Sequence, residues 1–79
     1  MMAQRTRSIK VLDTVALIED LPSRKLKRGE VGTVVEILAP SIYEVEFSDD
    51  DGETYAELAL RRDQLVLLHN KGEAFRIVA

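Results

Sequence analysis

The fold class of this chain follows most directly from the segment Lys27-Arg28-Gly29-Glu30-Val31-Gly32-Thr33-Val34-Val35-Glu36-Ile37. Two basic residues lead into a glycine, and a β-branched run then begins that a second glycine interrupts. A glycine inside a strand typically marks a bulge or a close backbone crossing, and small barrels need such corners. The segment therefore predicts a barrel strand with Val31, Val35 and Ile37 on its buried face.

Further short strands are predicted on both sides of this segment. Residues 11–18 form an aliphatic and β-branched run, and a charged loop follows at 19–28. Residues 42–47 alternate strictly between apolar and polar, and Asp51-Gly52 marks a hairpin turn. Residues 53–60 return as a strand, 61–64 form a short helical turn, and 65–68 form a last short strand.

These elements predict an all-β fold, an SH3-like, partly open barrel of about five strands with a short helical turn before the last barrel strand. Residues 1–8 are expected to be a flexible arm, 9–68 the barrel, and 69–79 a tail that forms either an extra edge strand or a loosely docked end. The expected core comprises Val15, Leu17, Val31, Val35, Ile37, Tyr43, Val45, Phe47, Ala56, Leu58 and Leu65.

Charge is distributed unevenly along the 79 residues. Residues 1–28 hold seven bases against three acids, a net charge of +4, whereas residues 29–79 hold four bases against eleven acids, a net charge of −7. Only the first third of the chain has the positive charge to bind a polyanion. The negative net charge of the whole chain argues against a dedicated nucleic-acid-binding domain.

Several classes of protein are disfavoured by composition. The chain has no cysteine, which excludes disulfides and thiolate zinc sites. Its apolar runs are too short to cross a bilayer, and the polar, basic start has no apolar stretch typical of a secretory signal. A bacterial-type cytoplasmic protein is expected.

No pattern in the sequence predicts catalysis, a cofactor or a metal. His69 is the single histidine and has no neighbouring nucleophile or ligand set, and nucleophile-elbow, phosphate-loop and zinc-protease motifs are absent. The acidic hairpin at 49–53 lacks the calcium-loop spacing, so it is interpreted as a solvated turn in which Asp51-Gly52 supplies positive φ angles. We expect a protein that is not an enzyme.

The candidate partner-binding residues lie in the first loop and on one later strand. The loop concentrates four cations within five residues, and these suit either phosphate or an acidic protein surface. Tyr55 falls opposite the apolar face of its strand, so it either anchors a partner or covers the open edge of its own barrel. The predicted surface comprises Leu21, Arg24, Lys25, Lys27, Arg28 and Tyr55.

A family resemblance covers residues 9–68. Leu12-Asp13-Thr14-Val15-Ala16-Leu17, then the glycine-containing strand from Leu26 to Glu36, then Tyr43-Glu44-Val45-Glu46-Phe47 and Asp51-Gly52-Glu53-Thr54-Tyr55-Ala56, resemble the bacterial domain of unknown function 4926. The glycine-containing strand is also similar, more distantly, to SH3-like accessory subunits and to KOW-type ribosomal and transcription modules.

These resemblances imply a binding module rather than a catalyst. The expected function is a non-catalytic protein-interaction module, an accessory or regulatory subunit, with the neutralising partner of a two-gene toxin–antitoxin-like pair as one form of that role. The alternative is an RNA- or DNA-binding module that uses the basic first loop. A protein partner, no membrane association and a monomeric or weakly homodimeric state are expected.

Overall fold

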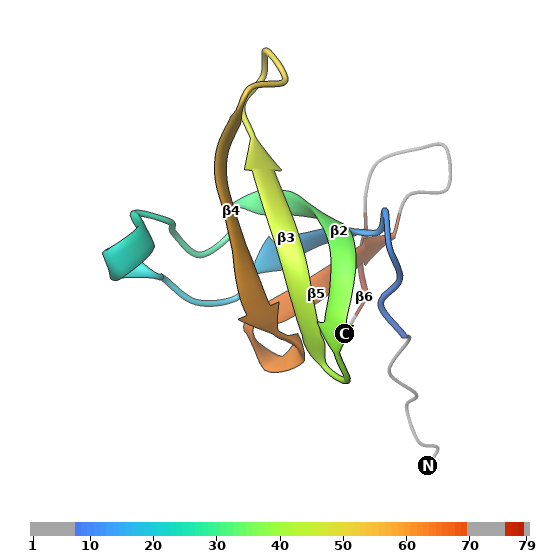
Figure 1. The fold of residues 1–79 in the computed structure, drawn as a ribbon. Helices are drawn as coiled ribbons and strands as arrows, with labels where there is room; N and C mark the ends of the chain where they lie inside the picture. The colour runs from blue at the N-terminus through green and yellow to red at the C-terminus, as the bar shows by residue number, and fades with distance from the viewer. Residues whose placement is uncertain (1–7, 70–75, 79) are drawn as a thin grey trace.

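The computed structural model describes residues 8–69 and 76–78 (Figure 1). This part of the chain contains six strands and two single-turn 3-10 helices, which lie between β1 and β2 and between β4 and β5. Their bounds are β1 (Thr14–Leu17), η1 (Pro22–Arg24), β2 (Val31–Ala39), β3 (Ile42–Ser48), β4 (Thr54–Arg61), η2 (Arg62–Gln64), β5 (Leu65–His69) and β6 (Arg76–Val78). No helix within these residues is long and apolar enough to cross a membrane.

The strands form one antiparallel sheet in the order β4-β3-β2-β1-β5-β6. β1 lies between β2 and β5, so the first and last predicted barrel strands are neighbours. The all-β prediction is confirmed, with β1 to β5 antiparallel and the 3-10 turn η2 directly before β5. The tail supplies β6, which pairs with β5, while residues 70–75 and 79 lie outside the described part.

The prediction for the start of β2 is wrong about which face is buried. Val31 is 47% exposed, whereas Val34 is fully buried. The inner face is the one that carries Gly32, where a Cβ atom would lie 2.7 Å from Val45 Cγ1 and 2.9 Å from the Glu46 carbonyl oxygen. The glycine therefore permits the close backbone crossing that the sequence suggested, and it does so on the face facing the core.

A bulge then reverses the alternation of β2. Pairing with β3 skips Val35, which is half-buried and has no partner across the ladder. The extra residue places Glu36 beside Glu44 on the outer face and Ile37 opposite Tyr43. Ile37 lies near the strand end and is 47% exposed. Neither Val35 nor Ile37 therefore belongs to the core as predicted.

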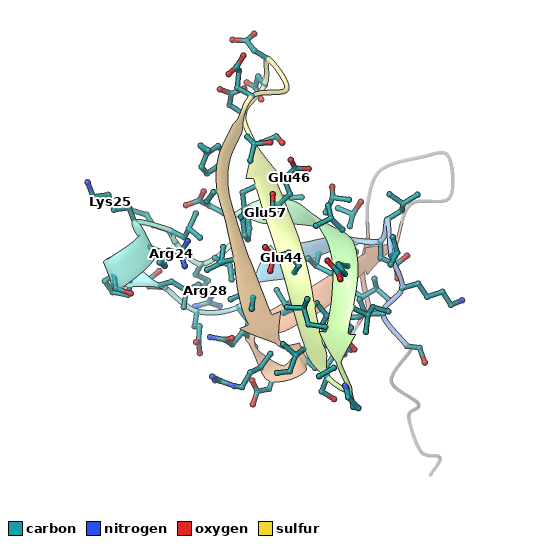
Figure 2. The ribbon with its side chains drawn as sticks, viewed as in Figure 1. Arg24, Lys25, Arg28, Glu44, Glu46 and Glu57 are labelled. Atoms are coloured by element: carbon teal, nitrogen blue, oxygen red, sulfur yellow. The ribbon has the colours of Figure 1, made fainter. Side chains whose placement is uncertain are left out.

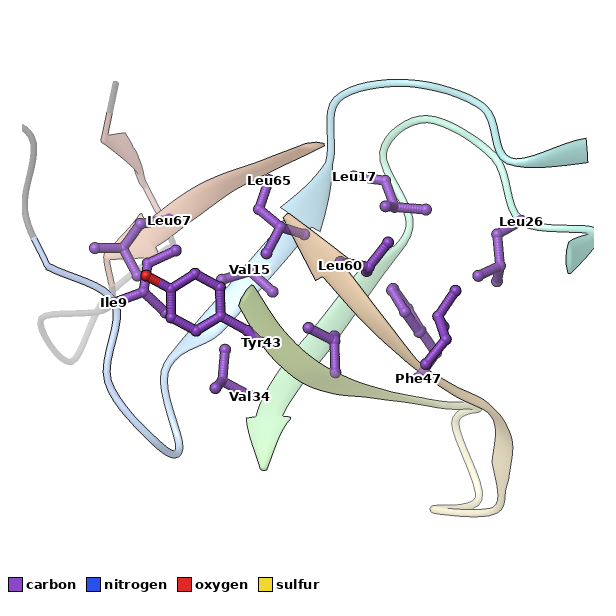
Figure 3. Close-up of a cluster of buried hydrophobic side chains, with 12 residues drawn as sticks. Ile9, Val15, Leu17, Leu26, Val34, Tyr43, Phe47, Leu60, Leu65 and Leu67 are labelled. Carbon is purple, nitrogen blue, oxygen red and sulfur yellow. The ribbon is translucent and has the colours of Figure 1, made fainter. Parts of the chain in front are cut away.

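The core lies inside the bend of the sheet (Figure 3). Burial confirms Val15, Leu17, Tyr43, Val45, Phe47, Leu58 and Leu65, and Ala56 packs against them partly buried. The structure adds Ile9, Leu26, Val34, Leu60 and Leu67. Because Ile9 and Leu26 come from segments outside the strands, loops as well as strands close this small core.

One buried polar side chain ties the last barrel turn to the first loop. Gln64 accepts a hydrogen bond from the Arg61 backbone N–H at 2.8 Å through Oε1 and donates one to Glu19 at 3.0 Å through Nε2. The backbone carbonyl of Gln64 also accepts a hydrogen bond from the backbone N–H of Ile18. These bonds fix where the first loop leaves the sheet.

Candidate functional site

The first loop connects β1 to β2 and is attached to the sheet and to the core at several points. Its ends are joined by backbone hydrogen bonds between Leu17 and Glu30 at 3.0 Å and between Gly29 and Leu17 at 2.8 Å. Leu21 and Leu26 form an isolated β-bridge further along the loop. Since Leu26 is only 2% exposed and lies in the core, the loop is held from within as well as at its base.

The tip of the loop is the 3-10 turn η1. Pro22 begins the turn, where its fixed φ angle is suited to helical geometry. Lys25 ends it in the left-handed conformation with φ 59°, and its backbone N–H bonds the Pro22 carbonyl at 3.1 Å. This reversal turns the chain back toward the sheet and leaves the basic side chains on its outer side.

The four loop cations are exposed, and in the part of the chain that the structure describes no acidic side chain lies within ion-pair distance of their charged groups. Arg24, Lys25, Lys27 and Arg28 are all exposed. Among residues 8–69 and 76–78, a single ion pair within 4.0 Å is found, and it joins Arg61 to Asp63. Figure 2 shows Arg24, Lys25 and Arg28 on the loop, apart from the glutamates of the sheet. The loop thus presents basic side chains that form no ion pair with the described residues, although Asp20 lies in the same loop near Lys25 and Lys27.

A single carboxylate connects the loop to β4. Glu30 Oε1 accepts a hydrogen bond of 2.7 Å from the Tyr55 hydroxyl, and Glu30 Oε2 accepts one of 2.8 Å from the Lys27 backbone N–H. The structure therefore brings together Lys27 and Tyr55, two of the predicted residues. Glu30 was not among them, and the signal that could have identified it is its position three residues after Lys27, across the turn at Gly29.

Tyr55 is partly exposed and partly packed on the core. Its side chain is 50% exposed, yet its ring centroid lies 6.5 Å from that of Phe47 and so covers part of the core. The hydrogen bond to Glu30, with burial and the charges of Glu30 and Asp49, raises the pKa of Tyr55 to about 12. The residue is thus held in place with half of its surface free.

Leu21, one of the residues of the predicted surface, is half-buried. It packs against the core cluster and forms the bridge with Leu26. Next to it, an open depression of about 360 Å³ is lined by Asp20, Pro22, Lys25, Leu26 and Lys27. The Asp20 carboxylate accepts a hydrogen bond of 2.9 Å from the Arg28 backbone N–H within the same loop.

A second charged surface covers the outer face of β2, β3 and β4 (Figure 2). Glu36 pairs with Glu44, and Glu46 pairs with Glu57, across neighbouring strands. Partial desolvation, a hydrogen bond with Glu44 and the charges of Glu44, Glu46 and Glu36 raise the pKa of Glu57. The sequence pattern showed Glu44 and Glu46 only as separate surface residues, because the strand register alone reveals that the four form a cluster.

The acidic hairpin is an ordered turn. Asp49 Oδ1 accepts the backbone N–H groups of Asp51 and Glu53, each at 2.9 Å. A positive φ angle occurs at Gly52, at 83°, and not at Asp51. In the described residues no group of three or more acidic or histidine side chains is arranged to hold a metal. The His69 side chain lies outside the described part of the structure.

Comparison with known proteins places the chain in a family. A search of curated proteins and a search of solved structures give no match. A family model described as "Domain of unknown function (DUF4926)" matches residues 11–67, which include β1 to β4, η2 and most of β5. This match covers well over half of the 79 residues. The chain therefore belongs to the family of the domain of unknown function DUF4926.

Proposed function

We propose that this protein is a non-catalytic protein-interaction module whose first loop docks against an acidic surface of a partner protein. The observation that carries this proposal is the set of four exposed loop cations whose charged side-chain groups have no carboxylate oxygen within 4.0 Å in the described residues. A partner that supplies the missing carboxylates gains charge-assisted hydrogen bonds. It also gains a fast, electrostatically steered encounter.

The loop is suited to docking because its shape is already fixed. The core anchor Leu26, the Leu21–Leu26 bridge and the hydrogen bonds of Glu30 hold it before any partner arrives. A partner therefore orders little of the backbone on binding, which lowers the entropic cost of association. Tyr55 adds a half-exposed aromatic ring, a residue type that often dominates binding energy.

A protein partner accounts for this surface better than a nucleic acid does. Single-stranded nucleic acids are held by basic grooves together with aromatic rings on which bases stack. In the described residues Tyr43 and Phe47 are buried, and the hydroxyl end of Tyr55 is engaged by Glu30. The glutamates on β2, β3 and β4 would repel any phosphate backbone that extended beyond the loop.

The role that we propose is that of an accessory or regulatory subunit in the cytoplasm of a bacterium. The neutralising member of a two-gene toxin–antitoxin-like pair is one form of this role. In that case the product of the adjacent gene is the partner, and its binding surface is acidic.

The test uses the full chain and its adjacent gene product. The tagged protein is co-expressed with that product, and the affinity of the purified complex is measured by calorimetry at several salt concentrations. The loop variant Arg24→Glu/Lys25→Glu should weaken binding at least about tenfold, because each reversed charge removes an attraction and adds a repulsion. The matched control Lys10→Glu/Arg61→Glu changes the net charge equally at exposed sites elsewhere and should bind like the wild type.

The contrary outcomes are distinct. A complex that both variants form equally well would show that the loop is not the docking surface. Failure of the adjacent product to bind would exclude the two-gene form of the proposal. Binding of generic RNA or single-stranded DNA, with an affinity that falls steeply with salt and is lost in the loop variant, would favour the nucleic-acid alternative.

A further inference from the structure

The outer edge of β4 has no partner strand in the described part of the chain. β4 is the terminal strand of the sheet order and pairs only with β3, along seven residue pairs from Ile42–Arg61 to Ser48–Thr54. No other segment of the described chain forms a backbone hydrogen bond with residues 54–60. Figure 1 shows β4 as a long strand at the margin of the sheet. Such an edge offers a row of N–H and C=O groups to an added strand.

The side chains beside this edge define what kind of strand fits there. Glu57 is exposed on the outer face of β4, with Glu46 directly across on β3. Glu44 lies diagonally behind them and Glu36 follows on β2. Ala59 is exposed and small, so it leaves room for a long side chain from a neighbouring strand. Of these four glutamates only Glu57 lies on β4 itself, while Glu46 and Glu44 on β3 and Glu36 on β2 add to the negative charge of the same face. A basic residue placed beside Glu57 by an added strand would therefore meet negative charge.

A second copy of this protein fits the same edge less well than a basic strand does. In an antiparallel pair related by a two-fold axis that continues the sheet, the registers that place Glu57 opposite its own counterpart or opposite Ala59 bring the acidic faces of the two copies together, and like charges at such positions are destabilising. The register that places Glu57 opposite Arg61 of the other copy pairs opposite charges, but it joins only residues 57–61 of the two strands and so gives a shorter ladder. A basic strand can instead pair along the whole edge and still place a cation beside Glu57.

We infer that the outer edge of β4 accepts an extended, basic strand of a partner protein by β-strand addition. Lysine or arginine residues at alternate positions of that strand lie on the face of Glu57 and Glu46. The residues between them lie on the face of Leu58 and Leu60, which point into the core, and are therefore apolar or small. This surface is opposite in charge to the basic first loop and meets it only at Tyr55, which Glu30 holds. The inference is carried by the strand edge and Glu57, so it does not rest on the function proposed above.

The probe is a synthetic peptide that alternates lysine and threonine, with both ends blocked. Binding is measured by NMR titration of the full chain at low salt, followed by amide hydrogen exchange. We expect alternate amides of residues 54–60 to gain protection, because every second N–H of an edge strand points outward. Amides of β3, which already have partners on both sides, should show little change.

A matched peptide separates strand addition from simple charge attraction. It has the same sequence but carries N-methyl groups on alternate backbone nitrogens, so it keeps its charge and cannot complete the ladder. We expect it to bind at least about tenfold more weakly. Equal binding of the two peptides, protection confined to other strands, or no binding of either peptide would overturn the inference.

Protein variants test the role of the carboxylates. Glu57→Lys should weaken binding of the unmodified peptide at least about tenfold, and the milder Glu57→Gln should weaken it by a smaller factor without a reversal of charge. Asp50→Lys, at the tip of the hairpin, is the matched control and should bind like the wild type. If Asp50→Lys weakens binding as much as Glu57→Lys, the peptide responds to net charge alone and the inference is wrong.

Discussion

The Tyr55 hydroxyl donates a 2.7 Å hydrogen bond to Glu30 Oε1 and so connects β4 to the end of the first loop. The other carboxylate oxygen of Glu30 accepts the backbone N–H of Lys27. One acidic side chain thus adds to the backbone hydrogen bonds and the core anchor Leu26 that hold the basic loop against the sheet. The contact joins residues 25 positions apart, between which β2 and β3 lie, and so adds a side-chain link to the strand pairing of this region.

Replacing Tyr55 with phenylalanine should destabilise the protein modestly. The variant keeps the ring against Phe47 and loses only the hydroxyl, so we expect a loss of about 0.5–1 kcal/mol in the free energy of unfolding. The lower end of that range is favoured because the tyrosine is half-exposed and Glu30 can be solvated. Urea unfolding at neutral pH measures the difference.

The same pair predicts a dependence on alkaline pH. The pKa of Tyr55 is raised from 10.0 to about 12 in the folded protein, so folding favours the protonated hydroxyl. Its contribution is fully present below pH 10 and is lost as the pH rises toward about 12. The stability gap between wild type and Tyr55→Phe should therefore close over that interval. A gap that stays constant would show that the hydroxyl does not donate to Glu30.

Gly32→Ala should lower the free energy of unfolding by more than its single added methyl group suggests. The new Cβ would lie 2.7 Å from Val45 Cγ1 and 2.9 Å from the carbonyl oxygen of Glu46, and the carbonyl cannot move without disturbing β3. We expect a loss of about 1–3 kcal/mol, as for overpacked core sites. Thermal unfolding provides the measurement.

A second glycine supplies the control for that variant. Gly52 has a φ angle of 83°, and a Cβ atom added there would have no other atom within 4 Å. Asparagine tolerates this left-handed conformation better than most residues do. Gly52→Asn should therefore unfold close to the wild-type temperature. A Gly32→Ala variant that unfolds as close to the wild-type temperature as Gly52→Asn would show that β3 does not crowd the glycine in β2.

Leu26→Ala should show that the first loop is part of the core. The leucine is 2% exposed and its truncation leaves a cavity beneath the loop, so a loss of about 2–4 kcal/mol in the free energy of unfolding is expected. Leu12→Ala, at a residue that is 75% exposed, should cost almost nothing. Hydrogen exchange should also show weaker protection of the Leu21 and Leu26 amides. Unchanged stability would contradict the core assignment.

The sequence predicted the strands well where alternation and turn residues agreed. Residues 42–47 alternate strictly, and Tyr43, Val45 and Phe47 are all buried in β3. The helical turn before β5 and the Asp-Gly hairpin were also recognised. In these segments the local preference for β-strand and the pattern of burial agree. An apolar–polar alternation with a period of two residues is therefore enough to predict the strand and its buried face.

The face of β2 could not be predicted in the same way. In Val31-Gly32-Thr33-Val34-Val35 nearly every residue suits a strand, so hydrophobicity does not show which side is buried. Gly32 faces the core because β3 crosses closely there, and the bulge at Val35 shifts the alternation by one residue. Both facts depend on contacts with another strand, which a pattern within one segment does not contain.

The candidate functional surface could likewise be predicted only in part from the sequence. The charge pattern identified the basic loop, but it did not reveal that Leu26 anchors the loop or that Glu30 joins it to Tyr55. The acidic face likewise depends on register, since Glu36 reaches Glu44 only because of the bulge in β2. Pairs of residues far apart in the sequence thus require the fold before they can be recognised.

Glu57→Gln should stabilise the protein at neutral pH, and the advantage should disappear in acid. The folded-state pKa of Glu57 is raised, so its protonated form favours folding and its ionised form opposes it. The side chain is exposed, so the neighbouring carboxylates of Glu44, Glu46 and Glu36 matter more here than burial. Wild type should therefore gain stability relative to the variant as the pH falls through that pKa toward 4.5, where the two converge. Thermal unfolding across this range, with Asp50→Asn as a control that lacks these neighbours, measures the effect. A variant that is less stable than wild type at neutral pH would show that the four glutamates do not repel one another across the sheet.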